Sequence, residues 1–199
     1  MGVALVYETH ATTTDNENGI ATGWLPGRLS EEGRKQAAAL GGRRRGDGIA
    51  VVFASDLARA IETAEIAFHG SGIPVLLDAR LRECNYGRLN GMPVSRLTVE
   101  RARRIDVPFP DGESYRQVVA RTGAFLRDLA ASWGGRRVLI VGHSANRWAL
   151  DHLLHGVPLE DLVDAPFGWR EGWEYVLPDG WPGPGAGADG DGHGGRGPA

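Results

Sequence analysis

Two histidines stand near the ends of short apolar runs, where a side chain can take part in chemistry. His10 follows the run over residues 3–7, and His143 follows the run over residues 138–141 and one glycine. A neutral imidazole can attack phosphorus directly, which gives a phosphohistidine and divides a phosphoryl transfer into two easier steps. We expect His10 to be this nucleophile, with the second histidine at an adjacent strand end.

Positive groups and hydrogen-bond donors must surround the phosphoryl oxygens during such an attack. Arg59 follows a third apolar run, over residues 50–54, and is one candidate. A protonated His143 and the backbone N–H of Ser144 are the others. The reaction also needs a proton donor for the leaving oxygen.

The elements that position these residues can be predicted from the same three apolar runs. The runs lack polar alternation, a pattern typical of parallel strands that are buried on both faces. In an open parallel sheet, ligands bind at the carboxyl ends of the strands, and the candidate residues fall there. A further strand is expected over residues 173–177, at an edge of the sheet.

Helical segments are expected between the strands. They run from Ser30 to about Gly41 and Gly42, from a cap at Ser55 or Asp56, from the turn that ends at Ser114, and over residues 145–154. Strands separated by helices predict right-handed βαβ crossovers. The expected fold class is therefore α/β, a three-layer sandwich with a mostly parallel central sheet and helices on both faces.

Length and composition predict one globular domain over residues 1–178. The remaining residues, 179–199, are almost all Gly, Pro, Asp and Ala, which predicts a disordered tail because such a segment buries little apolar surface. The net charge of −3 gives no basic field that would attract nucleic acid.

Membrane and metal association are not expected either. The apolar start is too short for a signal peptide, and no run approaches the ~18 apolar residues of a membrane span, so a soluble, cytoplasmic protein is expected. Cys84 is the only cysteine, so an internal disulfide and a CxxC zinc pair are excluded. We expect no metal and no cofactor.

Several sequence blocks occur in the order and spacing of one known family. The blocks are Thr9-His10-Ala11-Thr12-Thr13 with Asn16, Gly23-Trp24, Leu29-Ser30-Glu31-Glu32-Gly33, Ser55-Asp56-Leu57-Ala58-Arg59-Ala60-Ile61-Glu62-Thr63-Ala64, Leu81-Arg82-Glu83 with Gly87 and Gly91, Pro110-Asp111-Gly112-Glu113-Ser114, and Val141-Gly142-His143-Ser144. With these blocks, the chain resembles the histidine phosphatase, or phosphoglycerate mutase-like, superfamily over roughly residues 3 to 177.

The resemblance implies a phosphoglycerate mutase-like fold and a role for each matched residue. It makes His10 the nucleophile, Glu83 the proton donor and later the base for water, and His143 a catalytic phosphate binder. Expected substrate-binding residues are Arg59, Asn16, Thr9, Thr22, Gly23 and Ser144.

The first block departs from the family pattern, because Thr9 stands where the family has arginine. Loss of one preorganised donor typically lowers the rate by about 10²–10³. Three interpretations stay open. Arg28, Arg82 or Arg147 could replace the missing charge; the pocket could accept a substrate with less charge; or the chain could be a non-catalytic binding protein.

The expected function is hydrolysis of a small phosphate monoester through a phosphohistidine. The alternatives are a phosphoglycerate mutase-type phosphoryl transferase and a degenerate member that only binds a phosphorylated ligand.

Residues 100–112 form either a basic lid over the pocket or an ordinary solvated helix and loop. The sequence leaves the oligomeric state open, with a homodimer as one alternative.

Overall fold

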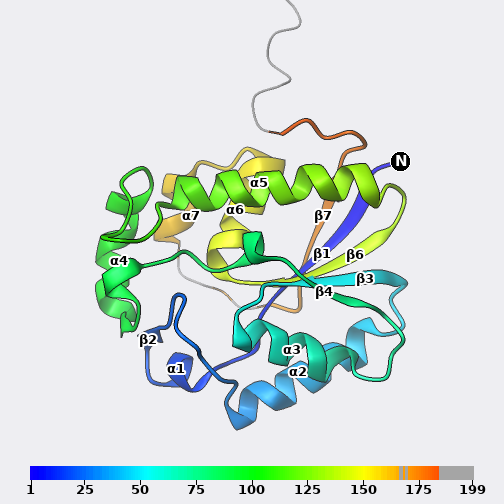
Figure 1. Ribbon diagram of the computed structural model, residues 1–199, viewed down its shortest axis with the longest axis horizontal. Coiled ribbons are helices and arrows are strands. Elements are labelled where there is room, and N and C mark those ends of the chain that lie inside the picture. The colour runs from blue at the N-terminus through cyan, green and yellow to red at the C-terminus, as the bar shows by residue number, and fades with distance from the viewer. Residues whose placement is uncertain (166–167, 169, 184–199) are drawn as a thin grey trace, which may run out of the picture.

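The chain folds around a five-stranded sheet with the strand order β4-β3-β6-β1-β7 (Figure 1). The computed structural model describes residues 1–165, 168 and 170–183. The strands are β1 (Val3–Thr9), β3 (Ile49–Ala54), β4 (Val75–Leu77), β6 (Arg137–Gly142) and β7 (Trp173–Leu177). Only β7, at one edge, is antiparallel to its neighbour. The predicted mostly parallel sheet and its edge strand are confirmed.

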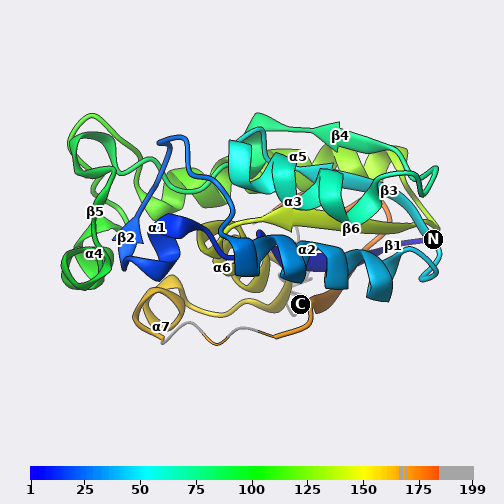
Figure 2. The same ribbon diagram turned by 90° about the horizontal axis from the view of Figure 1, so that it is seen from below.

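Helices cover both faces of the sheet, as expected for an α/β sandwich (Figures 1 and 2). One face packs against α2 (Glu31–Arg44) and α3 (Ala58–Phe68), and the other against α5 (Tyr115–Ser132) and α6 (Ser144–His155). Alternate strand residues point to opposite sides, so Val6 and Leu139 join the core under α3, whereas Leu5 and Ile140 join the core under α5. This explains why the strands lack polar alternation.

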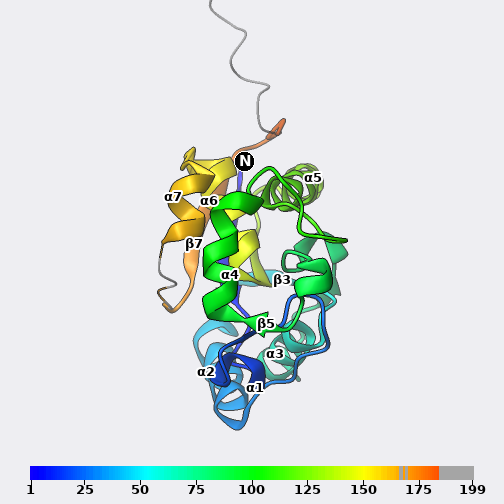
Figure 3. The same ribbon diagram turned by 90° about the vertical axis from the view of Figure 1, so that its left-hand side faces the viewer.

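Short elements that the sequence pattern did not predict gather at the carboxyl ends of β1 and β6 (Figures 1 and 3). They are α1 (Thr14–Glu17), β2 (Ile20–Ala21), β5 (Met92–Pro93), α4 (Val94–Arg101), α7 (Leu159–Asp164) and the 3₁₀ turns Ala79–Leu81, Gly87–Leu89 and Ala102–Arg104. These short elements cover the carboxyl end of the sheet. Among the described helices, none is both long and apolar enough to cross a membrane.

The end of α2 and the start of α3 differ from the prediction. The helix α2 continues through Gly41 and Gly42 to Arg44, because Gly41 is a packing residue: a Cβ there would lie 2.2 Å from the carbonyl oxygen of Ala67 in α3. The helix α3 begins at residue 58 with Leu57 as N-cap and no side-chain cap.

The expected tail from residue 179 is described only in its first part. Asp179 forms an ion pair of 2.8 Å with the N-terminal amine of Met1, and Trp181 packs against the core under α5. Residues 179–183 therefore contact the folded domain. Residues 184–199, on which most of the disorder prediction falls, lie outside the described residues.

The packing of α2 on α3 gives a prediction about its two adjacent glycines. Gly41→Ala should lower the free energy of unfolding by roughly 1–3 kcal/mol, because the added methyl overlaps the backbone of Ala67. Gly42→Ala is the matched control: its site is exposed and open, so alanine should raise stability by about 0.5–1 kcal/mol. Urea unfolding of both variants measures this, and equal effects would contradict the packing role of Gly41.

Candidate active site

The carboxyl ends of β1 and β6 and the start of α3 bring His10, His143 and Arg59 together. The backbone N–H of His10 donates to the carbonyl of Gly142 at 2.9 Å, which ties the end of one strand to the next. The two imidazole rings lie 5.0 Å apart between centroids. Three residues from distant parts of the chain therefore meet at one sheet end.

A pocket of about 120 Å³ opens at this point. Seven of the expected site residues line it: His10, Asn16, Thr22, Gly23, Arg59, Glu83 and Ser144. The other lining residues are Ile20, Ala21, Tyr86, Val94, Leu97, Arg101 and Trp148. His143 is fully buried behind Arg59, and Thr9 lines a neighbouring hollow.

The ring of His10 is oriented as a nucleophile requires. Its Nδ1 lies 2.8 Å from the carbonyl oxygen of Ala11, so Nδ1 carries the proton and donates it there. The lone pair then lies on Nε2, which accepts a hydrogen bond of 3.3 Å from Nε of Arg59. Burial and the positive charge of Arg59 lower the pKa of His10 to about 3. The ring is therefore neutral, and Nε2 can attack.

The guanidinium of Arg59 is buried, at 2% exposure, and its hydrogen bonds to described residues go to carbonyls and imidazoles, while the carboxyl groups of Glu83 and Asp15 act on it from a distance. Its Nη2 donates to the carbonyl of Gly23 at 2.8 Å and lies 3.3 Å from Nδ1 of His143. Carbonyls and neutral imidazoles carry no full charge. The positive charge of Arg59 thus remains available to an anion in the pocket.

The surroundings of His143 favour a neutral ring as well, and the protonated ring expected during phosphoryl transfer stays a prediction. Burial first, and then the charge of Arg59, hold the pKa of His143 well below its usual range. Arg59 donates to Nδ1, so the proton is on Nε2, which donates to the hydroxyl of Ser55 at 2.7 Å. Ser55 therefore orients His143 rather than capping α3.

Glu83 faces the same pocket from the irregular segment between two 3₁₀ turns. Its carboxyl is 8% exposed, and burial raises its pKa above the usual range. Its Oε1 accepts the backbone N–H of Cys84 at 2.7 Å. A buried carboxyl with a raised pKa holds its proton to higher pH, which is what a proton donor needs.

Ser144 and Gly23 contribute through the backbone. Ser144 is the first residue of α6, and the N–H groups of a first helical turn have no partner within the helix and carry partial positive charge. Gly23 has φ +58°, and a Cβ there would lie 1.9 Å from Oδ1 of Asn90. Only glycine fits while its carbonyl binds Arg59.

Asn16 and Thr22 line the pocket but are already partly engaged. Oδ1 of Asn16 accepts the backbone N–H of Thr13 at 3.0 Å in the cap of α1, so its amide NH₂ is the end that can donate to a ligand. The hydroxyl of Thr22 donates to Asp15 at 2.7 Å. Because its hydrogen is already donated to Asp15, the hydroxyl oxygen of Thr22 can only accept a hydrogen bond from a ligand.

The three arginines considered as replacements for the missing charge do not line the pocket. Arg82 binds Asp56 through two hydrogen bonds, and Arg147 binds Asp151 at 2.9 Å. Arg28 is exposed. Thr9 itself lines the neighbouring hollow of about 500 Å³, which shares His10 and Ser144 with the pocket.

Arg101 lines the pocket and is a cation that was not predicted from the sequence. It ends α4 and lies over the ring of Trp148, 5.2 Å from the centroid. Its Nε is buried and has no hydrogen-bond partner among the residues that the structure describes. The basic stretch over residues 100–112 was the feature of the sequence that could have indicated this cation. Composition does not show the orientation of a helix, so it could not show which arginine of the stretch faces the pocket.

Comparisons with known proteins show which family this chain resembles. The family model described as histidine phosphatase superfamily (branch 1) matches residues 9–168. The chain is 33% identical over 157 residues to the probable phosphoglycerate mutase GpmB of Citrobacter koseri, covering 75% of this chain and 73% of that protein. It is 32% identical over 173 residues to a 2,3-bisphosphoglycerate-dependent phosphoglycerate mutase of a Methylobacterium strain, covering 79% and 83%.

Solved structures of similar proteins share the fold. A mycobacterial hydrolase superposes with a TM-score of 0.79 at 27% identity, covering 92% of this chain and 95% of that one. A mycobacterial glucosyl-3-phosphoglycerate phosphatase superposes with a TM-score of 0.71 at 30% identity, covering 82% and 84%. With the family model matching most of its length, the chain belongs to the histidine phosphatase superfamily.

Proposed function

We propose that this protein hydrolyses a phosphate monoester through a phosphohistidine at His10. One observation carries the proposal: the unprotonated Nε2 of a neutral His10 meets the guanidinium of Arg59, which hydrogen-bonds to no carboxylate among the described residues, in a pocket that also holds the buried carboxyl of Glu83. These are a nucleophile, a phosphate-binding cation and a proton donor. The superfamily contains both phosphatases and mutases by name, which supports phosphoryl chemistry.

The reaction would proceed in two displacements. Nε2 of His10 attacks phosphorus, the bond from phosphorus to the ester oxygen breaks, and Glu83 gives its proton to that oxygen. Glu83, now a carboxylate, takes a proton from water while the water oxygen attacks phosphorus. The bond between nitrogen and phosphorus then breaks, and neutral His10 and inorganic phosphate result.

Charge stabilisation would come from Arg59, the first turn of α6 and Arg101. The first two line the pocket beside His10, and Arg101 lines it from α4. A phosphate dianion in the pocket would also raise the pKa of the His143 ring behind Arg59, because an opposite charge favours the protonated form of an imidazole. Arg101 is our candidate for the charge that Thr9 does not supply.

A phosphoglycerate mutase-type transferase is the second candidate, because the curated relatives carry that name at 31–34% identity. In a transferase, a substrate hydroxyl accepts the phosphoryl group in place of water. Incubation with 3-phosphoglycerate distinguishes the two: formation of the 2-isomer supports the transferase, and release of inorganic phosphate supports the hydrolase.

His10→Ala should abolish phosphate release from a panel of monoesters, because the variant lacks the nitrogen that attacks phosphorus in the proposed reaction. His69→Ala, which changes an exposed histidine, is the matched control and should keep full activity. Phosphate release is measured for both. Equal rates for wild type and His10→Ala would refute the assignment, and a wild type that only gains thermal stability with phosphate would point to a binding protein.

The rate of ester cleavage should fall as pH rises through the raised pKa of Glu83, because the donor must be protonated. His10 is protonated on Nε2 only near pH 3, so its ionisation does not change the pH–rate profile near neutral pH. Glu83→Gln should lower kcat for an alkyl phosphate by about 10²–10⁴ and remove this alkaline limb. The ester's own second ionisation, at about pH 6, remains in both profiles. An unchanged profile in the variant would exclude Glu83 as the donor.

Arg101→Met should raise KM for a monoester by about 10–100-fold, the equivalent of the ~1.5–3 kcal/mol that a hydrogen bond to a charged group contributes. Arg103→Met is the control, since Arg103 lies on the same basic stretch but is exposed. Thr9→Arg in the Arg101→Met background tests compensation and should recover part of the loss. The same KM in both single variants would rule out a role for Arg101 in phosphate binding.

A further inference from the structure

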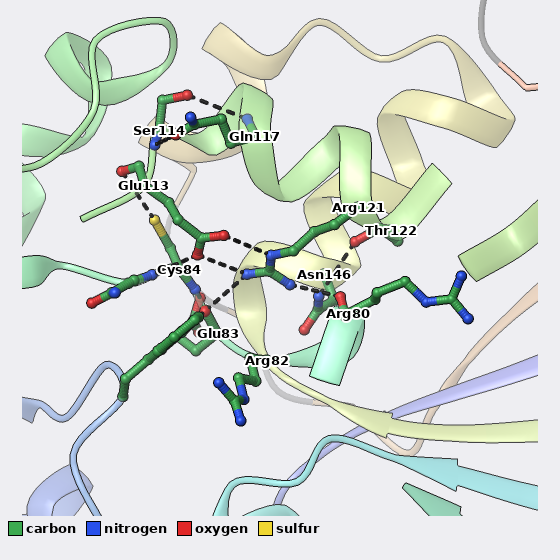
Figure 4. A network of polar contacts seen from close by, with 12 residues as sticks. Arg80, Arg82, Glu83, Cys84, Glu113, Ser114, Gln117, Arg121, Thr122 and Asn146 are labelled. Atoms are coloured by element: carbon green, nitrogen blue, oxygen red, sulfur yellow. Dashed lines mark hydrogen bonds and ion pairs between the residues drawn. The ribbon is translucent and has the colours of Figure 1, made fainter. Parts of the chain in front are cut away.

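An ion pair outside the pocket lies directly behind the segment that carries Glu83 (Figure 4). Glu113 precedes Ser114, the N-cap of α5, and Arg121 lies two turns into that helix. The guanidinium binds both carboxylate oxygens of Glu113, at 2.9 Å through Nε and 3.1 Å through Nη2. Both side chains are mostly buried, at 16% and 20% exposure. Neither has a part in the reaction proposed above.

The remaining contacts of this pair go to the backbone around Glu83. Nη2 of Arg121 donates to the carbonyl oxygen of Glu83 at 2.9 Å, and Nη1 donates to the carbonyl oxygen of Arg80 at 2.6 Å. On the other side of Cys84, the carboxylate of Glu113 accepts the backbone N–H of Asn85 at 2.9 Å. The pair therefore holds the chain on both sides of the Glu83–Cys84 peptide (Figure 4).

This peptide also sets the direction of the carboxyl group. The backbone N–H of Cys84 donates to Oε1 of Glu83 at 2.7 Å, so a rotation of the peptide would turn the carboxyl with it. The segment lies between the 3₁₀ turns Ala79–Leu81 and Gly87–Leu89 and belongs to neither sheet. Its position therefore depends on side-chain contacts and on the backbone N–H of Glu113, which donates to the carbonyl of Asn85 at 2.8 Å.

Arginine is suited to this place by its geometry. Its planar group has five N–H donors in a fixed fork, and here that fork meets two carboxylate oxygens and two carbonyls at once. Lysine has three donors on a single atom and cannot reach all four acceptors. The indole of Trp24 also donates to the carbonyl of Glu83, at 2.6 Å, from the pocket side.

We propose that Arg121 and Glu113 are positioning residues that hold the Glu83 carboxyl where it can protonate the leaving oxygen. This inference rests on the proposed function, since it concerns the proton donor of that reaction. Misplacement of a catalytic group by about 1 Å can lower a rate by about 10²-fold. Glu83 also acts on water in the second displacement, which is common to all esters, so the first displacement must be measured by kcat/KM. In kcat/KM the loss should appear only with esters whose leaving group needs a proton.

The test compares two substrates in wild type, Arg121→Lys, Arg121→Met and Glu113→Gln. Glycerol phosphate has an alkoxide leaving group that needs the donor, and p-nitrophenyl phosphate has an acidic one that does not. We expect kcat/KM for glycerol phosphate to fall by about tenfold or more while kcat/KM for p-nitrophenyl phosphate changes little. Arg116→Met is the control, because Arg116 lies on α5 but forms an exposed pair with Asp106.

A double-mutant cycle shows whether Arg121 acts through Glu83. In a Glu83→Gln background, Arg121→Met should cause little further loss with glycerol phosphate, because the donor is already absent. Thermal melts identify any variant that fails to fold, and Arg121→Lys then carries the comparison.

The outcomes separate this inference from the proposed function. Equal losses of kcat/KM with both esters, or additive losses in the cycle, would overturn the positioning role while His10-dependent activity still stands. A wild type that cleaves neither ester would overturn both.

Discussion

The site depends on a single buried positive charge. Arg59 lies between two imidazoles and is held by backbone carbonyls, so its charge is not cancelled by a carboxylate. The same charge has two effects. Together with burial, which is the larger cause, it lowers the pKa of His10 and of His143 and so favours neutral rings, and it attracts the phosphate that a neutral His10 would attack. A carboxylate at this position would remove the contribution of Arg59 to both effects.

The rest of the fold can be understood as support for this arrangement. The strands β1 and β6 deliver the two histidines to one end of the sheet, and Thr63 of α3 joins Arg59 to the histidine loop, because its hydroxyl donates to the carbonyl of Arg59 and accepts the N–H of Ala11. The tautomer of each imidazole is fixed by a neighbour, a carbonyl for His10 and a hydroxyl for His143. Preorganised groups of this kind need little rearrangement during a reaction.

The sequence predicted those parts that local physical rules determine. Apolar runs without alternation gave the central strands, and residues at their ends gave His10, Arg59 and His143. Gly41 was misjudged, because its close contact with Ala67 is tertiary and a glycine pair resembles a helix end. The pocket residue Arg101 was missed for a similar reason, since only the packing of α4 decides which arginine of a basic stretch turns inward. Glu83 was reached only through the family resemblance, because nothing in its own neighbourhood distinguishes it from a solvated carboxylate.

The central claim concerns the protonation state of His10, and nitrogen NMR of the imidazole measures it directly. In protein labelled at histidine, His10 should show the tautomer protonated at Nδ1, with a pKa of about 3, and Arg59→Met should raise that pKa. A ring that titrates at its ordinary value of about 6.5, or that carries its proton on Nε2, would contradict the account.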